Sequence, residues 1–211
     1  MTLLYLVRHG ETDWNAERRI QGSSDIPLND TGRRQATEAG RLLARRQWDG
    51  IFASPLIRAL DTARLISAEV GLGEPEVVPQ VAERNYGEAE GLTGDEVDAR
   101  YPNGTPVPGR ETRGEVAERV MPALLKLATE RPGQALLVVS HGGVIRAVLD
   151  TVEPGLKVER IPNGSVHSFR VEDGSLELIE FDDPIEAETD WPGSDDITDQ
   201  NRLEREDALE R

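Results

Sequence analysis

The chain has 211 residues and no cysteine. This absence excludes a disulfide framework, a thiolate metal site and a cysteine nucleophile. No apolar run comes near the roughly 20 residues that span a membrane, and no basic stretch followed by an apolar segment precedes the first predicted strand. We therefore expect a cytoplasmic protein that has no membrane partner.

Positive charge is also scarce, because 24 lysines and arginines stand against 40 aspartates and glutamates, for a formal net charge of −16. This acidity argues against a nucleic-acid partner. Residues 182–211 contain twelve acids, three bases and few apolar side chains. We expect a folded domain over residues 1–181, followed by an acidic, flexible C-terminal tail over residues 182–211.

Two unbroken apolar runs, residues 3–7 and 135–139, are typical of strands buried on both faces of a parallel sheet. Shorter runs predict strands at 50–53 and 76–79, and the turn signal at 172–174 predicts a hairpin. Apolar residues at helical spacing follow the runs at 3–7, 50–53 and 135–139. The alternation indicates an α/β fold, a three-layer α/β/α sandwich with a mostly parallel central sheet.

Capping residues predict where several helices begin. Asn29 or Thr31 is expected to cap the first long helix. Ser54 and Pro55 predict the start of the next, as N-cap and first helical residue. Thr112 begins a capping box. Between them, residues 88–109 are rich in glycine, proline and acids, which predicts a lid-like excursion with one short helix near residues 94–101.

Polar side chains follow both long apolar runs directly. Arg8 and His9 come after the first, and His141 comes after the second. Ligands bind at the carboxyl edge of open α/β sheets, so we expect the two imidazoles to converge there. Arg58, in the first turn of a helix at the same edge, adds a second guanidinium that favours a negative ligand. A surface arginine paired with Asp61 or Asp13 is the alternative interpretation.

Two histidines, two arginines and exposed helix amides form a donor set that suits a phosphoryl group. A neutral imidazole can attack phosphorus, and Glu83, in a loop after a predicted strand, is the best-placed acid for the leaving group. His9, His141 and Glu83 could instead ligate zinc. Arg8 and Arg58 would repel a divalent cation, so we disfavour that interpretation. His167 lies in a predicted strand without such neighbours, and we expect a structural role for it.

Five ordered motifs resemble the histidine phosphatase superfamily, which has the phosphoglycerate mutase-like fold. The resemblance covers residues 3–181. The motifs are Leu6-Val7-Arg8-His9-Gly10-Glu11-Thr12-Asp13-Trp14-Asn15, Gln21-Gly22, Ser54-Pro55-Leu56-Ile57-Arg58-Ala59, Glu83-Arg84-Asn85-Tyr86-Gly87 and Ser140-His141-Gly142-Gly143.

The resemblance implies a histidine phosphatase domain in which His9 is the phosphorylated nucleophile and Glu83 the proton donor. Arg8, Arg58 and His141 would complete the phosphate pocket. The implied partner is a small phosphorylated metabolite, with no metal and no cofactor, in a monomer or homodimer. Further implied substrate or phosphate contacts are Asn15, Gln21, Gly22, Tyr86 and Gly142.

Departures from the family bear on the reaction. Mutases that resemble this chain carry a long basic insertion before the second histidine, whereas residues 91–119 are shorter and acidic here. We therefore expect a phosphomonoester hydrolase, although the motif at residues 83–87 looks like mutase sequences. A cofactor-dependent phosphoglycerate mutase and a catalytically weak phosphoryl-binding regulatory module are the alternatives. Arg110 stands where related phosphatases often have glycine, and we expect it to contact substrate.

Overall fold

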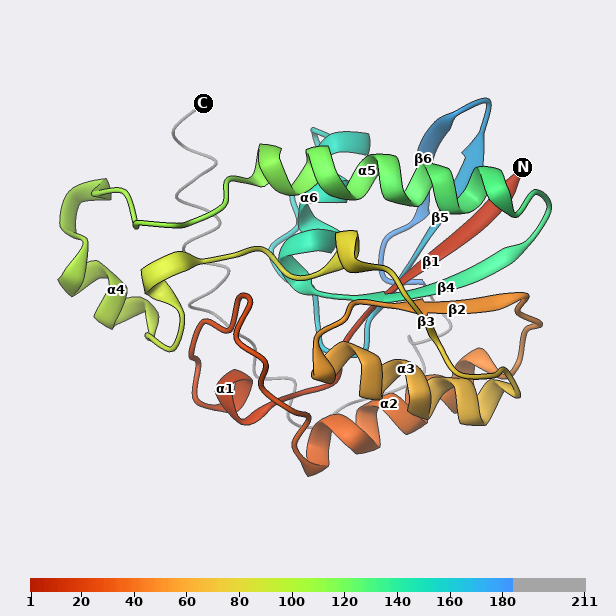
Figure 1. Ribbon diagram of the computed structural model, residues 1–211, viewed down its shortest axis with the longest axis horizontal. Coiled ribbons are helices and arrows are strands. Elements are labelled where there is room, and N and C mark those ends of the chain that lie inside the picture. Colours follow the sequence, from red (N-terminus) through yellow and green to blue (C-terminus); the bar gives the residue numbers. More distant parts are fainter. Residues whose placement is uncertain (184–211) are drawn as a thin grey trace.

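The computed structural model describes residues 1–183. A six-stranded sheet with the order β3-β2-β4-β1-β5-β6 forms its centre (Figure 1). The strands are β1 (Thr2–Arg8), β2 (Gly50–Ala53), β3 (Glu76–Val77), β4 (Ala135–Ser140), β5 (Val166–Glu172) and β6 (Ser175–Glu180). The helices are α1 (Asp13–Ala16), α2 (Asp30–Leu43), α3 (Ile57–Val70), α4 (Gly94–Arg100), α5 (Arg113–Glu130) and α6 (Gly142–Val152), with 3-10 turns η1 (Pro79–Val81), η2 (Gly87–Ala89) and η3 (Pro102–Gly104).

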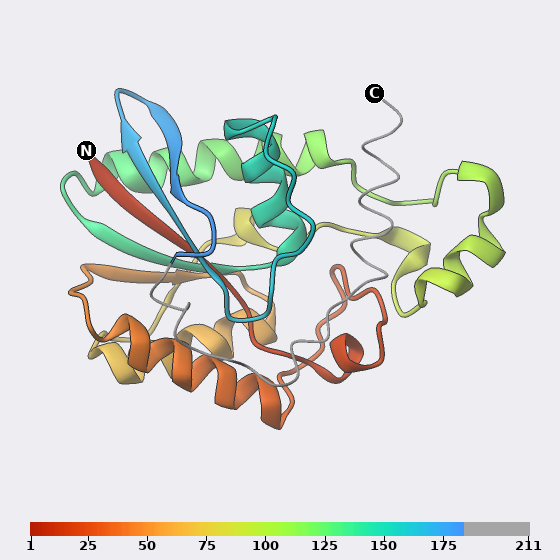
Figure 2. The same ribbon diagram turned by 180° about the vertical axis from the view of Figure 1, so that it is seen from behind.

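The sheet is mostly parallel. Strands β3, β2, β4 and β1 pair with one another in parallel, β5 pairs antiparallel with β1, and β6 pairs antiparallel with β5. The expected hairpin is therefore present, and it lies on the β1 side of the sheet (Figure 2). The predicted strand at residues 76–79 is shorter than expected, because only Glu76 and Val77 pair with β2.

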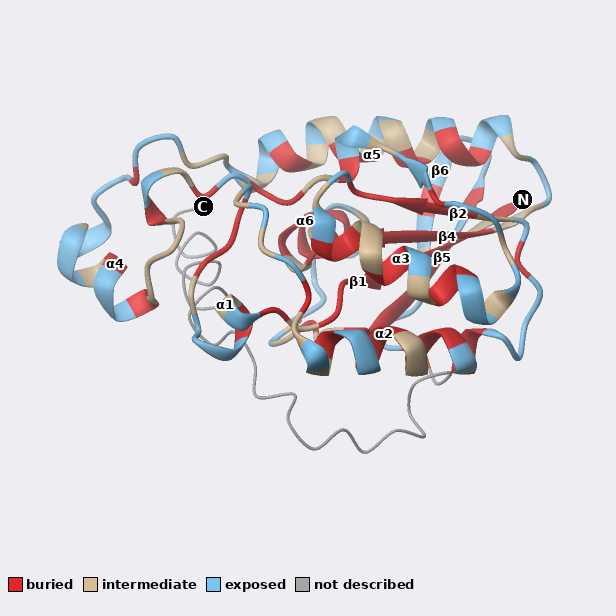
Figure 3. Ribbon diagram, turned by 60° about the horizontal axis from the view of Figure 1, so that its bottom comes forward, coloured by how far each residue is buried: buried red, intermediate tan, exposed pale blue. Residues whose placement is uncertain are grey.

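Helices cover both faces of the sheet, which confirms the predicted three-layer fold. Alternate residues of β1 enter opposite cores. Leu4 and Leu6 pack in the cluster that includes the apolar side chains of α5 and α6, whereas Tyr5 and Val7 pack in the cluster that includes those of α2 and α3. The central strands are buried, and the outward faces of α2 and α3 are exposed (Figure 3).

Two of the three predicted helix starts are confirmed. The Asn29 side chain accepts a hydrogen bond from Gly32 N at the start of α2, and Thr112 forms a capping box with Glu115 on α5. The start predicted at Ser54 and Pro55 is wrong, because α3 begins at Ile57. A side chain from far along the chain explains the difference: Oδ1 of Asp25 accepts the hydrogen bond from Ile57 N at 2.7 Å.

The excursion after the 83–87 motif has its own small core. Helix α4 matches the predicted short helix and extends away from the sheet (Figure 1). Tyr86, Ala89 and Val97 pack with Ile20 and Val107 in a third apolar cluster. This segment is thus anchored to the loop that follows β1.

The end of the described chain returns to the sheet. Asp182 N donates to Nδ1 of His167 at 3.1 Å, and Asp183 N donates to Val166 O at 2.9 Å. Asp183 is buried although the tail was expected from residue 182. The remainder of that predicted tail, residues 184–211, lies outside the described residues. Within residues 1–183, no helix is both long and apolar enough to cross a bilayer.

Candidate active site

The two histidines of the opening motifs converge as expected. Arg8 and Ser140 are register partners at the ends of the parallel strands β1 and β4, and the backbone N of His9 donates to Ser140 O at 3.0 Å. The next residue of each strand is a histidine, so the chain direction brings both rings to the same edge. Their ring centroids lie 5.1 Å apart.

The His9 imidazole is held neutral, with one nitrogen left as a nucleophile. Its Nδ1 lies 2.7 Å from Gly10 O. Since a carbonyl only accepts hydrogen bonds, Nδ1 carries the hydrogen and the lone pair stays on Nε2. Burial lowers the pKa of His9 well below its usual 6.5, and Arg58 and Arg8 lower it further. The ring is therefore a neutral base at neutral pH.

His141 is set as a hydrogen-bond donor. Its Nε2 lies 2.7 Å from Ser54 Oγ, and that hydroxyl oxygen accepts from Leu56 N at 3.2 Å. The serine hydroxyl can then donate its own hydrogen to Nε2, which leaves the ring hydrogen on Nδ1. Burial lowers the pKa of His141 well below 6.5, with Arg58, His9 and Arg8 as further causes.

Both predicted arginines are buried at this edge. Arg58 donates from Nη1 to Ser24 O and from Nη2 to Gly22 O, each at 2.7 Å. The alternative of a surface arginine paired with Asp61 or Asp13 is thus excluded. Arg8 donates from Nη1 to Ile161 O. Burial lowers the pKa of Arg58 to about 10, so the guanidinium stays charged at neutral pH.

Glu83 lies beside the second histidine. Its Oε1 accepts from Arg84 N at 2.8 Å, and its Oε2 lies 3.3 Å from Gly143 N in the first turn of α6. His141 is the N-cap of that helix. Glu83 is 6% exposed, and its carboxyl group lies at the start of the helix that His141 caps.

Asn15, Gln21 and Gly22 lie in the loop that follows β1. Asn15 Oδ1 accepts from Thr12 N at 3.1 Å, and Gln21 Oε1 accepts from Thr12 Oγ1 at 2.9 Å. Gly22 has a φ of +54°, and a Cβ there would lie 2.1 Å from Glu90 Oε1. Glycine is required at that position, where its carbonyl accepts from Arg58.

Gly142 and Tyr86 occupy different surroundings. Gly142 starts α6, and a Cβ there would lie 3.5 Å from Arg8 Nε. Tyr86 is fully buried in the third apolar cluster, with the guanidinium carbon of Arg84 5.2 Å and that of Arg110 5.9 Å from its ring centre. Its ring supports those arginines from within the fold.

Three residues support the site in ways that the sequence did not predict. Asn163 donates to His9 O at 2.9 Å and lies 3.3 Å from Asn15 Oδ1. Thr62 Oγ1 accepts from Gly10 N at 3.0 Å. Ser54, expected to cap a helix, orients His141. Asn163 stands in an irregular segment without periodicity, so no sequence signal could have identified it.

Three buried donors of the predicted site have no protein partner within residues 1–183: Nε of Arg58, Nδ2 of Asn15 and Nδ1 of His141. A buried polar group without a hydrogen bond costs about 1–3 kcal/mol. Donors of this kind suit an anion with several oxygens, and a phosphoryl group fits that description. In the same range, no group of three or more His, Asp or Glu side chains is arranged to hold a metal ion.

A cavity of about 620 Å³ opens beside Glu83. Asn85, Arg110 and Arg119 are among its lining residues. Arg110, expected from the sequence to contact substrate, thus lies at a cavity that Glu83 also lines. The arrangement allows a phosphoryl group at the histidine pair and a leaving group near Glu83.

Known proteins resemble this chain in sequence and in fold. The profile of the histidine phosphatase superfamily (branch 1) matches residues 4–184. The chain is 40% identical over 191 residues to a Bacillus subtilis protein named uncharacterized phosphatase PhoE, covering 90% of this chain and 92% of that one. It is also 36% identical to the 2,3-bisphosphoglycerate-dependent phosphoglycerate mutase of Methylobacterium radiotolerans, covering 76% and 83% of the two chains.

A solved structure extends the likeness to three dimensions. The mycobacterial glucosyl-3-phosphoglycerate phosphatase, solved with VO3, superposes with a TM-score of 0.76 at 30% identity, over 85% of this chain and 98% of that one. Sequence profile, relatives and fold agree. The chain therefore belongs to branch 1 of the histidine phosphatase superfamily, with a phosphoglycerate mutase-like fold.

Proposed function

We propose that this protein is a metal-independent phosphomonoester hydrolase that acts on a small phosphorylated metabolite through a phosphohistidine on His9. In the first step, His9 Nε2 forms a bond to phosphorus while the bond from phosphorus to the ester oxygen breaks. Glu83 gives its proton to that oxygen, so the alcohol leaves neutral. Arg8, Arg58 and His141 stabilise the charge on the phosphoryl oxygens.

The second step returns the enzyme to its starting state. Glu83, now a carboxylate, takes a proton from water, and the oxygen of that water bonds to phosphorus as the bond to Nε2 breaks. Inorganic phosphate leaves, and both Glu83 and His9 regain their original protonation. General acid–base help of this kind contributes about 10²–10⁴-fold to the rate.

One observation carries the proposal: the lone pair on Nε2 of a neutral His9 lies within a set of buried donors that lack protein acceptors. A nucleophile near the guanidinium groups of Arg8 and Arg58 is suited to an anionic electrophile, and those groups would repel a metal cation. Relatives named as phosphatases, at 40% and 30% identity, support hydrolysis.

A phosphoglycerate mutase is the second candidate function. It is favoured by the 83–87 motif and by a mutase relative at 36% identity. A mutase must retain a bisphosphorylated intermediate while it reorients. The stretch of residues 91–119 has only four bases, Arg100, Arg110, Arg113 and Arg119, and Arg113 and Arg119 pair with carboxylates. This stretch therefore offers little positive charge for a second phosphate, which favours the hydrolase.

A single assay separates the candidates. The protein is incubated in EDTA with a panel of phosphomonoesters that includes phosphoserine, sugar phosphates and 3-phosphoglycerate, and both free phosphate and isomer exchange are measured. We expect the protein to release free phosphate and the variant His9→Ala to release none. Isomer exchange of 3-phosphoglycerate without release would identify a mutase, and an absence of turnover with every ester would leave a phosphoryl-binding module.

A further inference from the structure

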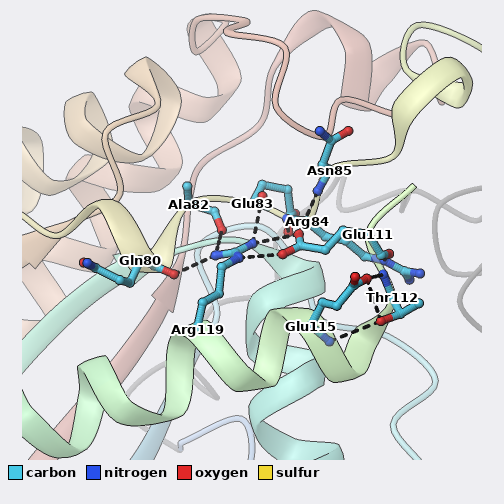
Figure 4. Close-up of polar contacts among 9 residues, drawn as sticks. All are labelled: Gln80, Ala82, Glu83, Arg84, Asn85, Glu111, Thr112, Glu115 and Arg119. Atoms are coloured by element: carbon cyan, nitrogen blue, oxygen red, sulfur yellow. Dashed lines mark hydrogen bonds and ion pairs between the residues drawn. The ribbon is translucent and has the colours of Figure 1, made fainter. Parts of the chain in front are cut away.

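Arg119 on α5 uses every hydrogen of its guanidinium group. Nε donates to Glu111 Oε1 at 2.7 Å and Nη2 to Glu111 Oε2 at 3.0 Å. The other three hydrogens go to backbone carbonyls: Nη1 donates to Gln80 O at 2.6 Å and Ala82 O at 2.8 Å, and Nη2 to Glu83 O at 3.1 Å. These five bonds exhaust the donors of an arginine (Figure 4).

Glu111 holds the chain on the other side of Glu83. Its backbone N donates to Asn85 O at 2.8 Å, and its Oε2 accepts from Asn85 N at 3.1 Å. Its carbonyl accepts from Arg84 Nε at 2.6 Å. The Arg119–Glu111 pair therefore contacts the backbone from Gln80 to Asn85, with Glu83 in the middle (Figure 4).

This segment has little regular structure of its own. Residues 82–85 lie between the turn η1 and an isolated bridge at Tyr86, and none belongs to a helix or strand. The position of the Glu83 carboxyl group depends on that backbone, because the segment carries the side chain and Oε1 accepts from the backbone N of the next residue, Arg84. Helix α5 is a rigid element, and Arg119 connects the loop to it.

We propose that Arg119, together with Glu111, is a positioning residue that sets the place of the Glu83 carboxyl group. The inference rests on the proposed function, in which Glu83 protonates the leaving group. Arg119 need not touch the reacting atoms. It fixes three carbonyls of the segment that carries the acid, and a misplacement of about 1 Å can cost about 10²-fold in rate.

Lysine cannot replace arginine in this role. It keeps the positive charge but has three donors at one point, whereas the acceptors here surround a planar group. In Arg119→Lys the charge next to Glu111 is retained and the three-carbonyl contact is lost. Arg113→Lys is the matched control, since Arg113 lies on the same helix and pairs with Asp150 at 2.9 Å, away from Glu83.

The test compares two classes of ester. Alkyl phosphates need a proton on the leaving oxygen, whereas p-nitrophenyl phosphate has a leaving group that departs without one. We compare kcat/KM, which reports the first step alone, because the second step is common to all esters and also uses Glu83. We expect Arg119→Lys to lower kcat/KM for glycerol phosphate by about 10–100-fold, with a much smaller loss for p-nitrophenyl phosphate. Arg113→Lys should leave both unchanged. Thermal midpoints of the two variants are measured alongside.

Glu83→Gln separates a failure of this inference from a failure of the proposed function. If Glu83→Gln lowers kcat/KM equally for both esters, Glu83 is not the acid and both proposals fail. If Glu83→Gln lowers kcat/KM selectively for glycerol phosphate but Arg119→Lys lowers it equally for both esters, only the positioning role is wrong. The double variant should be no slower than Glu83→Gln alone, because a misplaced acid and an absent acid are equivalent; additive losses would also overturn the positioning role.

Glu111→Gln tests the same role if Arg119→Lys does not fold. The amide keeps the shape of the carboxylate but presents a donor to the guanidinium, so one of the paired bonds is lost. The same selective loss for glycerol phosphate is expected. A variant that folds and treats both esters alike would contradict the positioning role.

Discussion

At the scale of single residues, three buried imidazoles dominate the chemistry of this protein. The chain has three histidines, and burial is the first cause of a lowered pKa for each. Positive neighbours add to it, since Arg8 lowers all three. Neutral rings at neutral pH are what nucleophilic attack by His9 requires, because a protonated ring has no lone pair to offer.

This electrostatic environment predicts how the histidines titrate. We expect that no imidazole titrates with a midpoint near the usual 6.5, so that the ring signals of the untagged protein stay in place from pH 8 to pH 6. Proton–nitrogen correlation spectra of ¹⁵N-labelled protein measure this directly. A ring that titrates at or above 6.5 would contradict the neutral, buried arrangement of the site.

His167 predicts a pH dependence of stability. Its Nδ1 accepts a hydrogen bond from Asp182 N, and its Nε2 forms a hydrogen bond of 2.9 Å with Ser165 Oγ. Burial lowers the pKa of His167 to about 3. Below pH 6.5 His167 binds a proton in the unfolded chain, whereas in the folded chain it stays neutral until the pH approaches 3. The free energy of unfolding therefore falls as the pH drops from 6.5 toward 3, by up to about 1.4 kcal/mol per pH unit.

Urea unfolding at pH 7 and pH 5 checks this dependence. In His167→Gln, whose amide does not titrate, the difference in free energy between the two pH values should be smaller than in the natural chain by about 2 kcal/mol. An unchanged difference would mean that His167 is protonated in the folded protein or contributes nothing to acid unfolding.

At the scale of secondary-structure elements, the loop after β1 and the start of α2 lie too close together for side chains at Gly10 and Gly32. A Cβ on Gly32 would lie 2.0 Å from Glu11 O, and one on Gly10 would lie 2.3 Å from Gly32 O. Asn29 N and Nδ2 both donate to Glu11. The start of α2 thus fixes the loop that carries His9.

We expect Gly32→Ala to destabilise the fold by about 1–3 kcal/mol, since backbone atoms must move to admit the methyl group. Turnover should fall as well, because the displaced backbone adjoins His9. Gly114→Ala is the control: it too lies near the start of a helix, and the nearest atom to its Cβ would be 3.9 Å away. Denaturant unfolding and kcat for both variants test this, and equal effects would contradict the close-approach argument.

Elements were predictable where local signals agree with the fold. The apolar runs predicted β1 and β4, and Thr112 with Glu115 predicted the start of α5. The start of α3 was missed because the hydrogen bond from its first amide, Ile57 N, goes to the side chain of Asp25, which is 32 residues away in the chain. Pairing across such a distance leaves no local pattern. Arg119 and Glu111 escaped for the same reason, since an arginine on an exposed helical face gives no sign of the carbonyls it contacts.

At the scale of the whole molecule, the last two residues of the described part of the chain, Asp182 and Asp183, are bonded back to the sheet. The ring of Phe181 lies 4.7 Å from that of His167, and Asp182 and Asp183 each donate a backbone hydrogen bond to β5. Arg46, three residues after the end of α2, has its Nη2 3.7 Å from Asp183 Oδ1. The sequence pattern placed the boundary at residue 181, because acidic residues gave no indication of burial.

Two truncations test this boundary. A chain that ends at Asp183 retains both hydrogen bonds, whereas one that ends at Phe181 loses them and leaves His167 Nδ1 without its donor. At about 1 kcal/mol for each bond, the shorter chain should melt about 5 °C lower than the longer one. Calorimetry of the two proteins provides the comparison, and identical midpoints would show that residues 182–183 add nothing to stability.

The central claim is that His9 carries the phosphoryl group during turnover. The direct measurement is rapid quenching of the protein with a ³²P-labelled ester, followed by counting of protein-bound phosphate that survives base and is released by acid. We predict about one labile phosphoryl group per chain, absent in His9→Asn and present in Arg113→Lys. Label that persists in His9→Asn, or turnover without any labelled protein, would contradict the mechanism.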